Sequence, residues 1–508
     1  MRSPRIPGRI RGTCRDGPPT RLRRPARRSF DKRFDKDFDK DTARRFHGRT
    51  HRAGPDTAGH TAGTDDARGH TMAWDFSTEP EFEEQLDWMR GFVRDEIYPL
   101  ETLHLDYPAL QAATAPLKEQ VKARGLWAAH LPPELGGQGF GQVKLGLMHE
   151  ILGRTAYGPV VFGNNAPDSG NAELLAHGIA ASGREWQRDK WLRPLLDGQI
   201  RSGFSMTEPD TAGSDPTLLA TRAVRDGDEW VIDGHKWFTS NGSVADILIA
   251  MVVTDPDAKP HNRASMIVVP ADTPGVEIVR DVVTLEDPGR TERLQPAGFG
   301  GHAEIRYHSV RVPYENLLGN EGDGFKLAQL RLGPGRIHHC MRWLGQAQRA
   351  MDMLCERALS RHAHGTLLAE KQTVQNWIAD SYAEIQAARL MTLHAAWRMD
   401  RDGAPAARTE ISAIKFFGAK VLYDVIDRAI QIHGALGFSA DLPLERMYRW
   451  ARASRIYDGP DEVHRVTVAR RVLRGYEPVD VPTEHVPTRR EAARKKFAAY
   501  LDAAEGQA

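Results

Sequence analysis

The spacing of apolar residues along this 508-residue chain changes character twice. From about residue 76 to residue 196, apolar positions recur every three or four residues, as on one face of a helix. Between residues 202 and 318 they alternate with polar positions or form short runs, which is typical of strands, and beyond residue 324 the helical spacing returns. A chain of this length needs more than one hydrophobic core, so the order predicts a helical domain, a β domain and a second helical domain.

The first helical segment has a predicted start and a predicted buried face. Thr78 stands three residues before Glu81, with Pro80 between them, and this pattern is typical of a capping box at a helix N-terminus. The apolar residues that follow at helical spacing are Phe82, Leu86, Met89, Val93 and Ile97. We expect them to face the core of the N-terminal domain.

In the β domain, residues 230–238 are interpreted as two strands around a turn at Asp233-Gly234. Residues 247–253, 265–269 and 305–312 are predicted to be further strands. Helical stripes follow in the last domain, where we expect core packing for Trp343, Ala347, Ala350, Leu354, Ala358, Ile378, Tyr382, Ile385, Val421, Val425, Ile426, Ala429 and Ile430. A short basic helix is predicted near residues 489–501.

Charge is distributed unevenly along the chain. Residues 1–71 contain 19 Lys and Arg against 9 Asp, which leaves 50 basic and 59 acidic residues in the remainder. The first 71 residues are rich in Arg, Gly and Pro and have no apolar periodicity, so we predict a disordered basic extension. A basic arm for nucleic acid and an upstream segment preceding a true start at Met72 are both compatible with this pattern. The acidic body argues against nucleic-acid binding.

The remaining boundaries follow from the pattern. We predict a helical domain over residues 72–201, a β domain over 202–318, a helical domain over 319–475 and a tail over 476–508. Three cysteines without metal-ligand spacing favour a reducing compartment, and we expect no bound metal. This compartment would be the cytoplasm of a bacterium, or the mitochondrion if the source is eukaryotic. No apolar run is long enough to predict a membrane span.

Three segments have the residue types of a cofactor site. Residues 204–215 read Phe-Ser-Met-Thr-Glu-Pro-Asp-Thr-Ala-Gly-Ser-Asp, in which Gly213 permits close backbone approach while Thr207 and Ser214 offer hydroxyl groups. Residues 236–242 read Lys-Trp-Phe-Thr-Ser-Asn-Gly, and residues 431–438 read Gln-Ile-His-Gly-Ala-Leu-Gly-Phe. The first segment alone also fits a β-turn with capping hydroxyl groups.

Together and in this order, the three segments resemble the acyl-CoA dehydrogenase family over residues 76–475. The resemblance implies an N-terminal α-helical domain, a central β-barrel or sandwich, a C-terminal four-helix bundle and the cofactor FAD. It implies cofactor contacts for Phe204, Met206, Thr207, Gly213, Ser214, Phe238, Thr239, Ser240, Arg361, Gln372, Gln431, Gly434, Ala435, Pro460 and Glu462. Phe238 and Ser240 stand where the family commonly has Trp and Thr, so Trp237 is an alternative stacking ring.

The resemblance also points to the catalytic base. Desaturation of an acyl-CoA thioester needs a carboxylate to remove the α-proton while a hydride leaves the β carbon for the flavin. Most of the family has Tyr-Glu-Gly at the position where this chain has Tyr457-Asp458-Gly459. We therefore expect Asp458 to be the base, with a pKa that rises when substrate excludes water. The alternative for Asp458 is a helix N-cap.

Two neighbouring positions bear on this assignment. Some family members place a Glu where this chain has Gly335, and glycine cannot act as a base. Asp461 and Glu462 are also interpreted as first-turn carboxylates of the helix that follows. The resemblance implies that Ser214, Arg336 and Gly459 contact the acyl-CoA substrate.

Residues 331–342 and 458–464 resemble the subgroup typified by acyl-CoA dehydrogenase family member 11. His338, His339 and Arg342 are candidates for recognising a polar or anionic group on the acyl chain, such as a 4-hydroxy or 4-phospho group. The alternative is that they lie on a helix surface or at an interface.

The resemblance implies partners and competing functions. It implies an electron-transfer flavoprotein as electron acceptor and a homodimer or homotetramer, because residues 431–435 would reach the FAD of a neighbouring subunit. An oxidase of the same fold, acting on nitroalkanes or acyl-CoA, remains an alternative, since nitroalkane oxidases use an Asp base. A non-catalytic flavin-fold protein that binds DNA through its basic ends is a third possibility.

Overall fold

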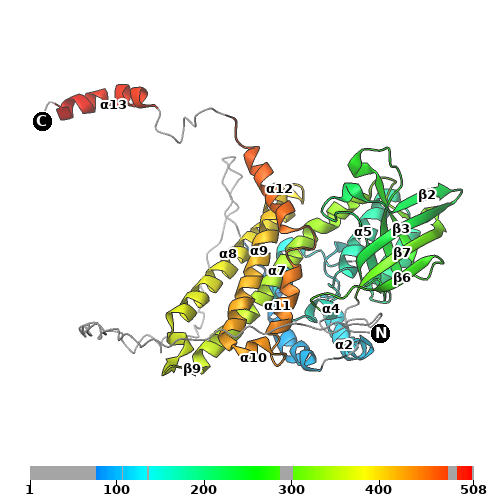
Figure 1. Ribbon diagram of the computed structural model, residues 1–508, viewed down its shortest axis with the longest axis horizontal. Coiled ribbons are helices and arrows are strands. Elements are labelled where there is room, and N and C mark those ends of the chain that lie inside the picture. The colour runs from blue at the N-terminus through cyan, green and yellow to red at the C-terminus, as the bar shows by residue number, and fades with distance from the viewer. Residues whose placement is uncertain are drawn as a thin grey trace, which may run out of the picture. The chain divides into compact units, whose positions relative to one another are not determined.

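The computed structural model describes residues 76–103, 105, 107–133, 137–286, 301–478 and 489–505. Residues 72–508 form one compact unit, whose elements are labelled in Figure 1. The predicted disordered extension, residues 1–71, lies outside the described residues. Within the described part of the chain, no helix is long and apolar enough to cross a bilayer.

The N-terminal domain is helical, as predicted. Its elements are α1 (Pro80–Phe92), a π-helical turn (Val93–Ile97), α2 (Tyr107–Ala123), α3 (Gly141–Leu152), α4 (Gly158–Val161), α5 (Asp168–Ser182), a second π-helical turn (Arg188–Leu192) and α6 (Arg193–Leu196). The predicted buried face of the first helix is confirmed, because all five of its apolar residues are at most 6% exposed. The predicted capping box is wrong: Glu79 is the N-cap, and the Thr78 hydroxyl donates to the Glu83 carboxylate at 2.5 Å instead.

In the described part of the β domain, eight strands form one connected sheet. They are β1 (Ser202–Ser205), β2 (Arg222–Asp226), β3 (Glu229–Ser240), β4 (Ile247–Val253), β5 (Ala264–Pro270), β6 (Val276–Asp281), β7 (His302–Pro313) and β8 (Leu317–Leu318). The strand order is β6-β7-β3-β2-β4-β5-β8, with β1 parallel to β4. A single residue pair, Arg222 with Val253, joins β2 to β4.

Two apolar cores explain how this sheet is folded. Leu248 of β4 and Ile267 of β5 share one core with Ile232 of β3 and Ile305 of β7, so the two halves of the sheet face each other as in a sandwich. The opposite face of β4 and β5, including Ile249, packs on the helices of the N-terminal domain. The strands predicted at residues 247–253, 265–269 and 305–312 are therefore confirmed.

The predicted hairpin at Asp233-Gly234 is wrong. Both residues lie inside β3, at a shift in its register with β7, while the chain turns earlier at Gly227, which has φ +62°. The Asp233 carboxylate accepts the backbone N–H of Ser309 at 2.7 Å. A Cβ on Gly234 would lie 2.4 Å from side-chain atoms of Thr221, so close packing requires this glycine.

The C-terminal domain is built on three long helices, α7 (Gly324–Ser360), α8 (Gln372–Asp402) and α9 (Arg408–His433). They run alongside one another in Figure 1 and contact each other in pairs. The short α10 (Ala435–Phe438), α11 (Leu444–Ala453) and α12 (Asp461–Leu473) all pack on α9. The predicted basic helix near the end is confirmed as α13 (Arg490–Glu505).

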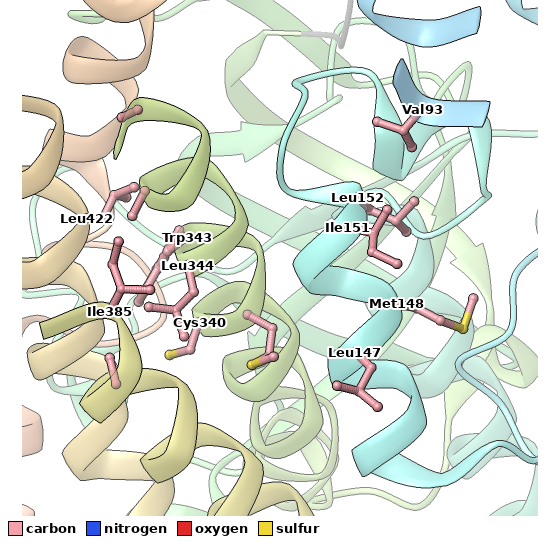
Figure 2. Packing of buried hydrophobic residues seen from close by; sticks show 14 of the residues in the cluster. Val93, Leu147, Met148, Ile151, Leu152, Cys340, Trp343, Leu344, Ile385 and Leu422 are labelled. Carbon is pink, nitrogen blue, oxygen red and sulfur yellow. The ribbon is translucent and has the colours of Figure 1, made fainter. Parts of the chain in front are cut away.

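The helical domains share one apolar core. Figure 2 shows Leu147 and Ile151 of α3 on the same cluster as Cys340 and Leu344 of α7. The predicted stripes on α7 and α9 are buried or half-buried, but Tyr382 of α8 is 59% exposed and does not belong to the core. Because α5 and α7 also pack together, residues of the N-terminal domain can reach the start of α7.

Candidate active site

Asp458 lies in a loop that the protein holds through its backbone carbonyl groups. The Asp458 carbonyl accepts hydrogen bonds from Nε and Nη2 of Arg336, at 3.0 and 2.9 Å, and from Nε2 of His464, at 3.1 Å. Lys415 Nζ donates to the carbonyl of Ser454 at 2.6 Å. These donors hold Asp458 in a left-handed backbone conformation, φ +55°, which is unusual for a residue other than glycine and is common at functional sites.

The helix-cap alternative for Asp458 is wrong. The N-cap of α12 is Pro460, and it makes no side-chain cap hydrogen bond. Asp461 and Glu462 occupy the first turn, as expected, and Asp461 pairs with Arg455 at 2.7 Å. The Asp458 carboxylate is therefore free to point elsewhere.

Asp458 lines a small hollow of about 30 Å³ between α5, α7 and the loop. Most of the lining is polar. The lining residues are His130, His149, Asn164, Ala166, Ser169, Gly170, Glu173, Arg331, Leu332, Gly335, His338, His339, Arg342 and Asp458. The cavity therefore brings together the predicted base with His338, His339 and Arg342, which do not lie on an outer surface.

Cations dominate the electrostatics around the base. Burial would raise the pKa of Asp458, but the His339 imidazole beside it and the guanidinium groups of Arg331 and Arg336 together outweigh burial and hold that pKa below its ordinary value. Lys415 acts in the same direction. The Asp458 carboxylate is thus ionised at neutral pH before any substrate binds.

Glu173 of α5 has the opposite character. It is 6% exposed, and burial raises its pKa to about 8, although Arg331 opposes that rise. At neutral pH it is a protonated carboxylic acid. Two carboxyl groups of one cavity therefore have pKa values displaced in opposite directions, an arrangement that is common in active sites.

Several cavity residues were missed because no local sequence pattern indicates them. Arg331 lies over the ring of Phe204, with 4.4 Å from the guanidinium carbon to the ring centroid, and faces Asp458. Glu173 did carry a usable signal, since it is a charged residue beside the apolar Leu174 and Leu175. His149 is only 1% exposed and stacks on His338 at 4.4 Å.

The first two predicted cofactor segments lie side by side. The Trp237 N–H donates to the Thr207 carbonyl at 3.0 Å. Lys236 Nζ donates to the Met206 carbonyl at 2.8 Å and to the Glu208 carboxylate at 2.9 Å. Lys236 and Glu208 are both buried, so this ion pair fixes the two segments from behind.

Phe238 stands out on this surface. It lies at a register shift between β3 and β7, has φ +50° and is 41% exposed. The shift turns the ring outward, where it contacts Trp237 edge-on at 5.0 Å. The Ser240 hydroxyl pairs with His302 Nδ1 at 2.9 Å, and His302 is a further residue that the sequence did not indicate.

The Thr239 side chain faces away from this surface. It is fully buried, and its hydroxyl donates to the Ser205 hydroxyl at 3.3 Å. The cofactor contact of Thr239 stays a prediction, which its backbone rather than its side chain would make. Alternation along β3 places the neighbouring Phe238 and Ser240 outward.

The residues on this surface fit a flavin. Phe238 offers an exposed ring face, and among the described residues neither the Thr207 nor the Ser214 hydroxyl has a hydrogen-bond partner in the protein. A Cβ on Gly213 would lie 3.4 Å from the Thr207 side chain, so these two residues of the first cofactor segment lie close together. A planar ring with oxygen acceptors beside it matches these groups.

The third predicted segment lies elsewhere on the C-terminal domain. Because α7 and α9 run in one direction and α8 in the other, Arg361, Gln372 and Gln431 belong to the same end of the bundle, where Figure 1 shows β9 (His362–Ala363) and α10. All three are exposed, as are Gly434 and Ala435. Their contact with a cofactor stays a prediction, as it does for Pro460 and Glu462.

Comparison with known proteins agrees with this arrangement. Family models for the N-terminal, middle and C-terminal domains of acyl-CoA dehydrogenase match residues 79–199, 203–286 and 322–473. The Mycobacterium tuberculosis protein named probable acyl-CoA dehydrogenase FadE2 is 46% identical over 76% of this chain and 93% of its own length. A structure from Mycobacterium abscessus described as an acyl-CoA dehydrogenase has a TM-score of 0.72 and 39% identity, covering 79% of this chain and all of that one.

The expected subgroup is also supported. Acyl-CoA dehydrogenase family member 11 of Rattus norvegicus is 40% identical over 77% of this chain, which spans about half the length of that relative. The predicted fold and cofactor agree with the matched domains. The chain belongs to the acyl-CoA dehydrogenase family and its member 11-like subgroup, and is an oxidoreductase that uses FAD.

Proposed function

We propose that this protein desaturates an acyl-CoA thioester between its α and β carbons, with Asp458 as the base that removes the α-proton. The observation that supports this most directly is a carboxyl group with a lowered pKa in a residue that lines a mostly polar cavity, while its own backbone carbonyl is held by Arg336 and His464. When bound, FAD supplies the hydride acceptor.

The same loop offers a donor for the substrate carbonyl. Among the described residues, the Asp458 N–H donates to no protein acceptor. Negative charge develops on the thioester oxygen as the α-proton leaves, and a fixed backbone N–H is suited to stabilise it. Asp458 would then serve the reaction through both its carboxylate and its amide, and Gly459 would supply the space beside it.

An Asp base is shorter than the Glu common in the family by one methylene group. The side chain must therefore be placed with little freedom, because displacements of about 1 Å matter to rate. Arg336, predicted to contact the CoA side, uses two of its N–H donors on the Asp458 carbonyl. We propose that it acts mainly by holding the base loop.

The lining of the cavity bears on the substrate. A fatty acyl chain prefers an apolar tunnel, whereas Glu173, Arg331, His338 and Arg342 line this cavity. We propose an acyl chain with a polar group beyond the β carbon, such as a 4-hydroxy or 4-phospho substituent. Equal turnover of plain and substituted acyl-CoAs of the same length would contradict this.

The test of the main proposal is an anaerobic titration of the flavoprotein with a panel of acyl-CoAs, followed by flavin absorbance. We expect wild type to be bleached by at least one thioester, and Asp458→Asn to bind that thioester without bleaching. Asp441→Asn, which changes an exposed carboxylate outside the cavity, is the matched control and should be bleached like wild type. Normal bleaching of Asp458→Asn would refute its role as base.

Re-oxidation separates a dehydrogenase from an oxidase. We propose an electron-transfer flavoprotein as acceptor, so the reduced enzyme should react slowly with oxygen and quickly with such a flavoprotein. Fast reaction with oxygen would favour an oxidase, the second candidate, which the Asp base supports. We further propose a homodimer or homotetramer, because the exposed Gln431 and Gly434 would meet the FAD of a neighbouring subunit; a monomer in sedimentation would contradict this.

A further inference from the structure

His339 of α7 lies between an obligatory donor and an obligatory acceptor. Its Nδ1 is 3.0 Å from Nη2 of Arg342, and its Nε2 is 3.3 Å from Oδ2 of Asp458. The three side chains line the same cavity. The imidazole is therefore the direct neighbour of the carboxylate that is proposed to take the α-proton.

The chemistry of these neighbours fixes the tautomer of His339. A guanidinium group can only donate hydrogen bonds, so Nδ1 must be the acceptor and carries no proton. In a neutral imidazole the proton then resides on Nε2, which faces the carboxylate. Burial lowers the pKa of His339 to about 3, so the ring is neutral at physiological pH and acts as a donor without a net charge.

Packing fixes the orientation of the ring. The His339 ring packs beside the rings of Tyr457 and Trp343, with ring centroids 5.2 and 6.2 Å apart. Trp343 Nε1 donates to the Tyr457 hydroxyl at 2.8 Å. Arg342 is itself anchored, since its Nη1 donates to the Asn164 carbonyl at 3.0 Å. Neither the donor nor the imidazole can turn away without breaking these contacts.

We propose that Arg342 selects the Nε2–H tautomer of His339, and that His339 in turn orients the Asp458 carboxylate toward the substrate. This inference rests on the proposed function of Asp458. His339 is a positioning residue, because it acts through the base. The Nε2 and Oδ2 atoms are 3.3 Å apart but are not aligned as a hydrogen bond, and catalytic contacts of this kind tighten when substrate binds.

An oriented neutral donor suits this base. The backbone of Asp458 is held at its carbonyl, but those contacts leave rotation about the side-chain bonds undetermined. A carboxylate flanked by Arg331 could otherwise turn toward that cation and away from the reacting carbon. The Nε2–H of His339 gives one carboxylate oxygen a fixed partner and leaves the other for the proton.

Other titratable groups share this environment. Arg331 and Arg336 of α7, Lys415 of α9, His464 of α12 and Glu173 of α5 all surround the cavity or the base loop. Tyr457, His338 and the buried His130 and His149 are nearby as well. They are unchanged in the variants below, so a difference between variants reports on His339 and Arg342.

The experiment measures the rate of flavin reduction by saturating substrate from pH 3 to pH 9, with each pH reached only during rapid mixing, so that titration of Asp458 falls within the range. His339→Phe removes the donor and keeps a ring, whereas His339→Gln places an amide N–H near the position of Nε2. We expect the rate of His339→Phe to be at least about tenfold lower than that of wild type. We also expect its acid limb, the part of the pH profile where protonation of Asp458 slows the reaction, to lie at higher pH. His339→Gln should restore both toward wild type.

The direction of these two changes separates positioning from basicity. A higher pKa makes a carboxylate a stronger base, so a variant with a raised acid limb would react faster if basicity were decisive. A slower reaction together with a raised limb shows that orientation was lost. A merely structural defect would lower FAD content or rate without moving the acid limb.

Arg342 is tested through a double variant. Arg342→Met should reproduce the loss of His339→Phe, because the tautomer is no longer selected. In the His339→Gln background the same change should lower the rate by a smaller factor than in wild type, since an amide has no tautomer to select. An equal loss in both backgrounds would overturn the role assigned to Arg342.

Failure of the inference can be told from failure of the proposed function. If wild type is reduced by acyl-CoA and His339→Phe keeps the wild-type rate and acid limb, the positioning role is refuted while Asp458 stands as base. If no acyl-CoA reduces wild type, both are refuted. FAD content, measured for every variant, identifies any variant that fails to fold. If His339→Phe is one of these, the comparison of His339→Gln with and without Arg342→Met still tests the inference.

Discussion

Replacing Lys236 by Met should loosen the proposed flavin loop. Lys236 is fully buried, and its ammonium group is shared between the Glu208 carboxylate and the Met206 carbonyl. Glu208 also accepts the backbone N–H groups of Ala220 and Thr221 at 2.7 and 2.8 Å. The variant leaves this buried carboxylate without its counter-charge.

The magnitude follows from how Glu208 can respond. Removing one partner of a buried ion pair costs about 3–5 kcal/mol. Glu208 can escape the full cost by taking up a proton, which for a carboxyl group of ordinary pKa 4.5 costs about 3 kcal/mol at pH 7. We therefore expect the free energy of local opening of the loop to fall by about 3 kcal/mol, which raises the population of the open state about 100-fold.

Hydrogen exchange measures this opening directly. Peptides containing the amides of Ala220, Thr221 and Trp237 should exchange about 100-fold faster in Lys236→Met at pH 7. The difference should shrink as the pH falls toward 5, because protonating Glu208 becomes easier there. Arg311→Met, which breaks two exposed ion pairs of the same domain, is the control and should leave the exchange of these amides unchanged.

Unchanged protection in Lys236→Met would refute the reasoning. It would mean that Glu208 is held adequately by backbone donors alone, and that the Lys-Glu pair does not fix the loop. A loss of protection spread equally over the C-terminal helices would also contradict it, since the pair lies within the β domain.

Three shorter predictions follow from the site. Gly459→Ala should lower the rate of flavin reduction at least about tenfold with FAD retained, because Gly459 has φ +96° and a Cβ would lie 2.9 Å from His464 Nε2. In wild type, the raised pKa of Glu173 lets the folded state keep a proton that the unfolded state has lost, so the contribution of Glu173 to stability falls by about 1.4 kcal/mol per pH unit between pH 4.5 and about 8. Glu173→Gln should remove this pH dependence of stability, measured by urea midpoints at pH 6 and 9. Phe238→Ala should weaken FAD binding, measured by apoprotein titration, and unchanged affinity would favour Trp237 as the stacking ring.

The sequence was informative where the structure is local. Helical and strand periods predicted the three-part order because burial of one face repeats with the geometry of each element. The Asp233-Gly234 hairpin failed because an Asp-Gly pair can also serve side-chain bonding and close packing inside a strand, as it does in β3. Tyr382 failed because spacing alone does not say which face of α8 meets a neighbour.

The site was predictable in part. Asp458 and the flavin loop lie in contiguous motifs, so a resemblance could identify them. Arg331, Glu173 and His339 are brought together from α5 and α7, which are separated by the whole β domain in sequence. No spacing rule joins such residues, because their proximity is created by packing between domains.

The cations around Asp458 have a consequence for catalysis. A carboxylate whose pKa is held low is a weak base, so it gives little driving force for removing a thioester α-proton. Most of that force must then come from stabilising the oxygen on which charge develops. Asp458 offers both groups, since its backbone N–H is not engaged by the described residues. Arg336 and His464 hold its carbonyl and so position that donor together with the base, which explains why distorting the loop should harm the rate more than changing the basicity of the carboxylate.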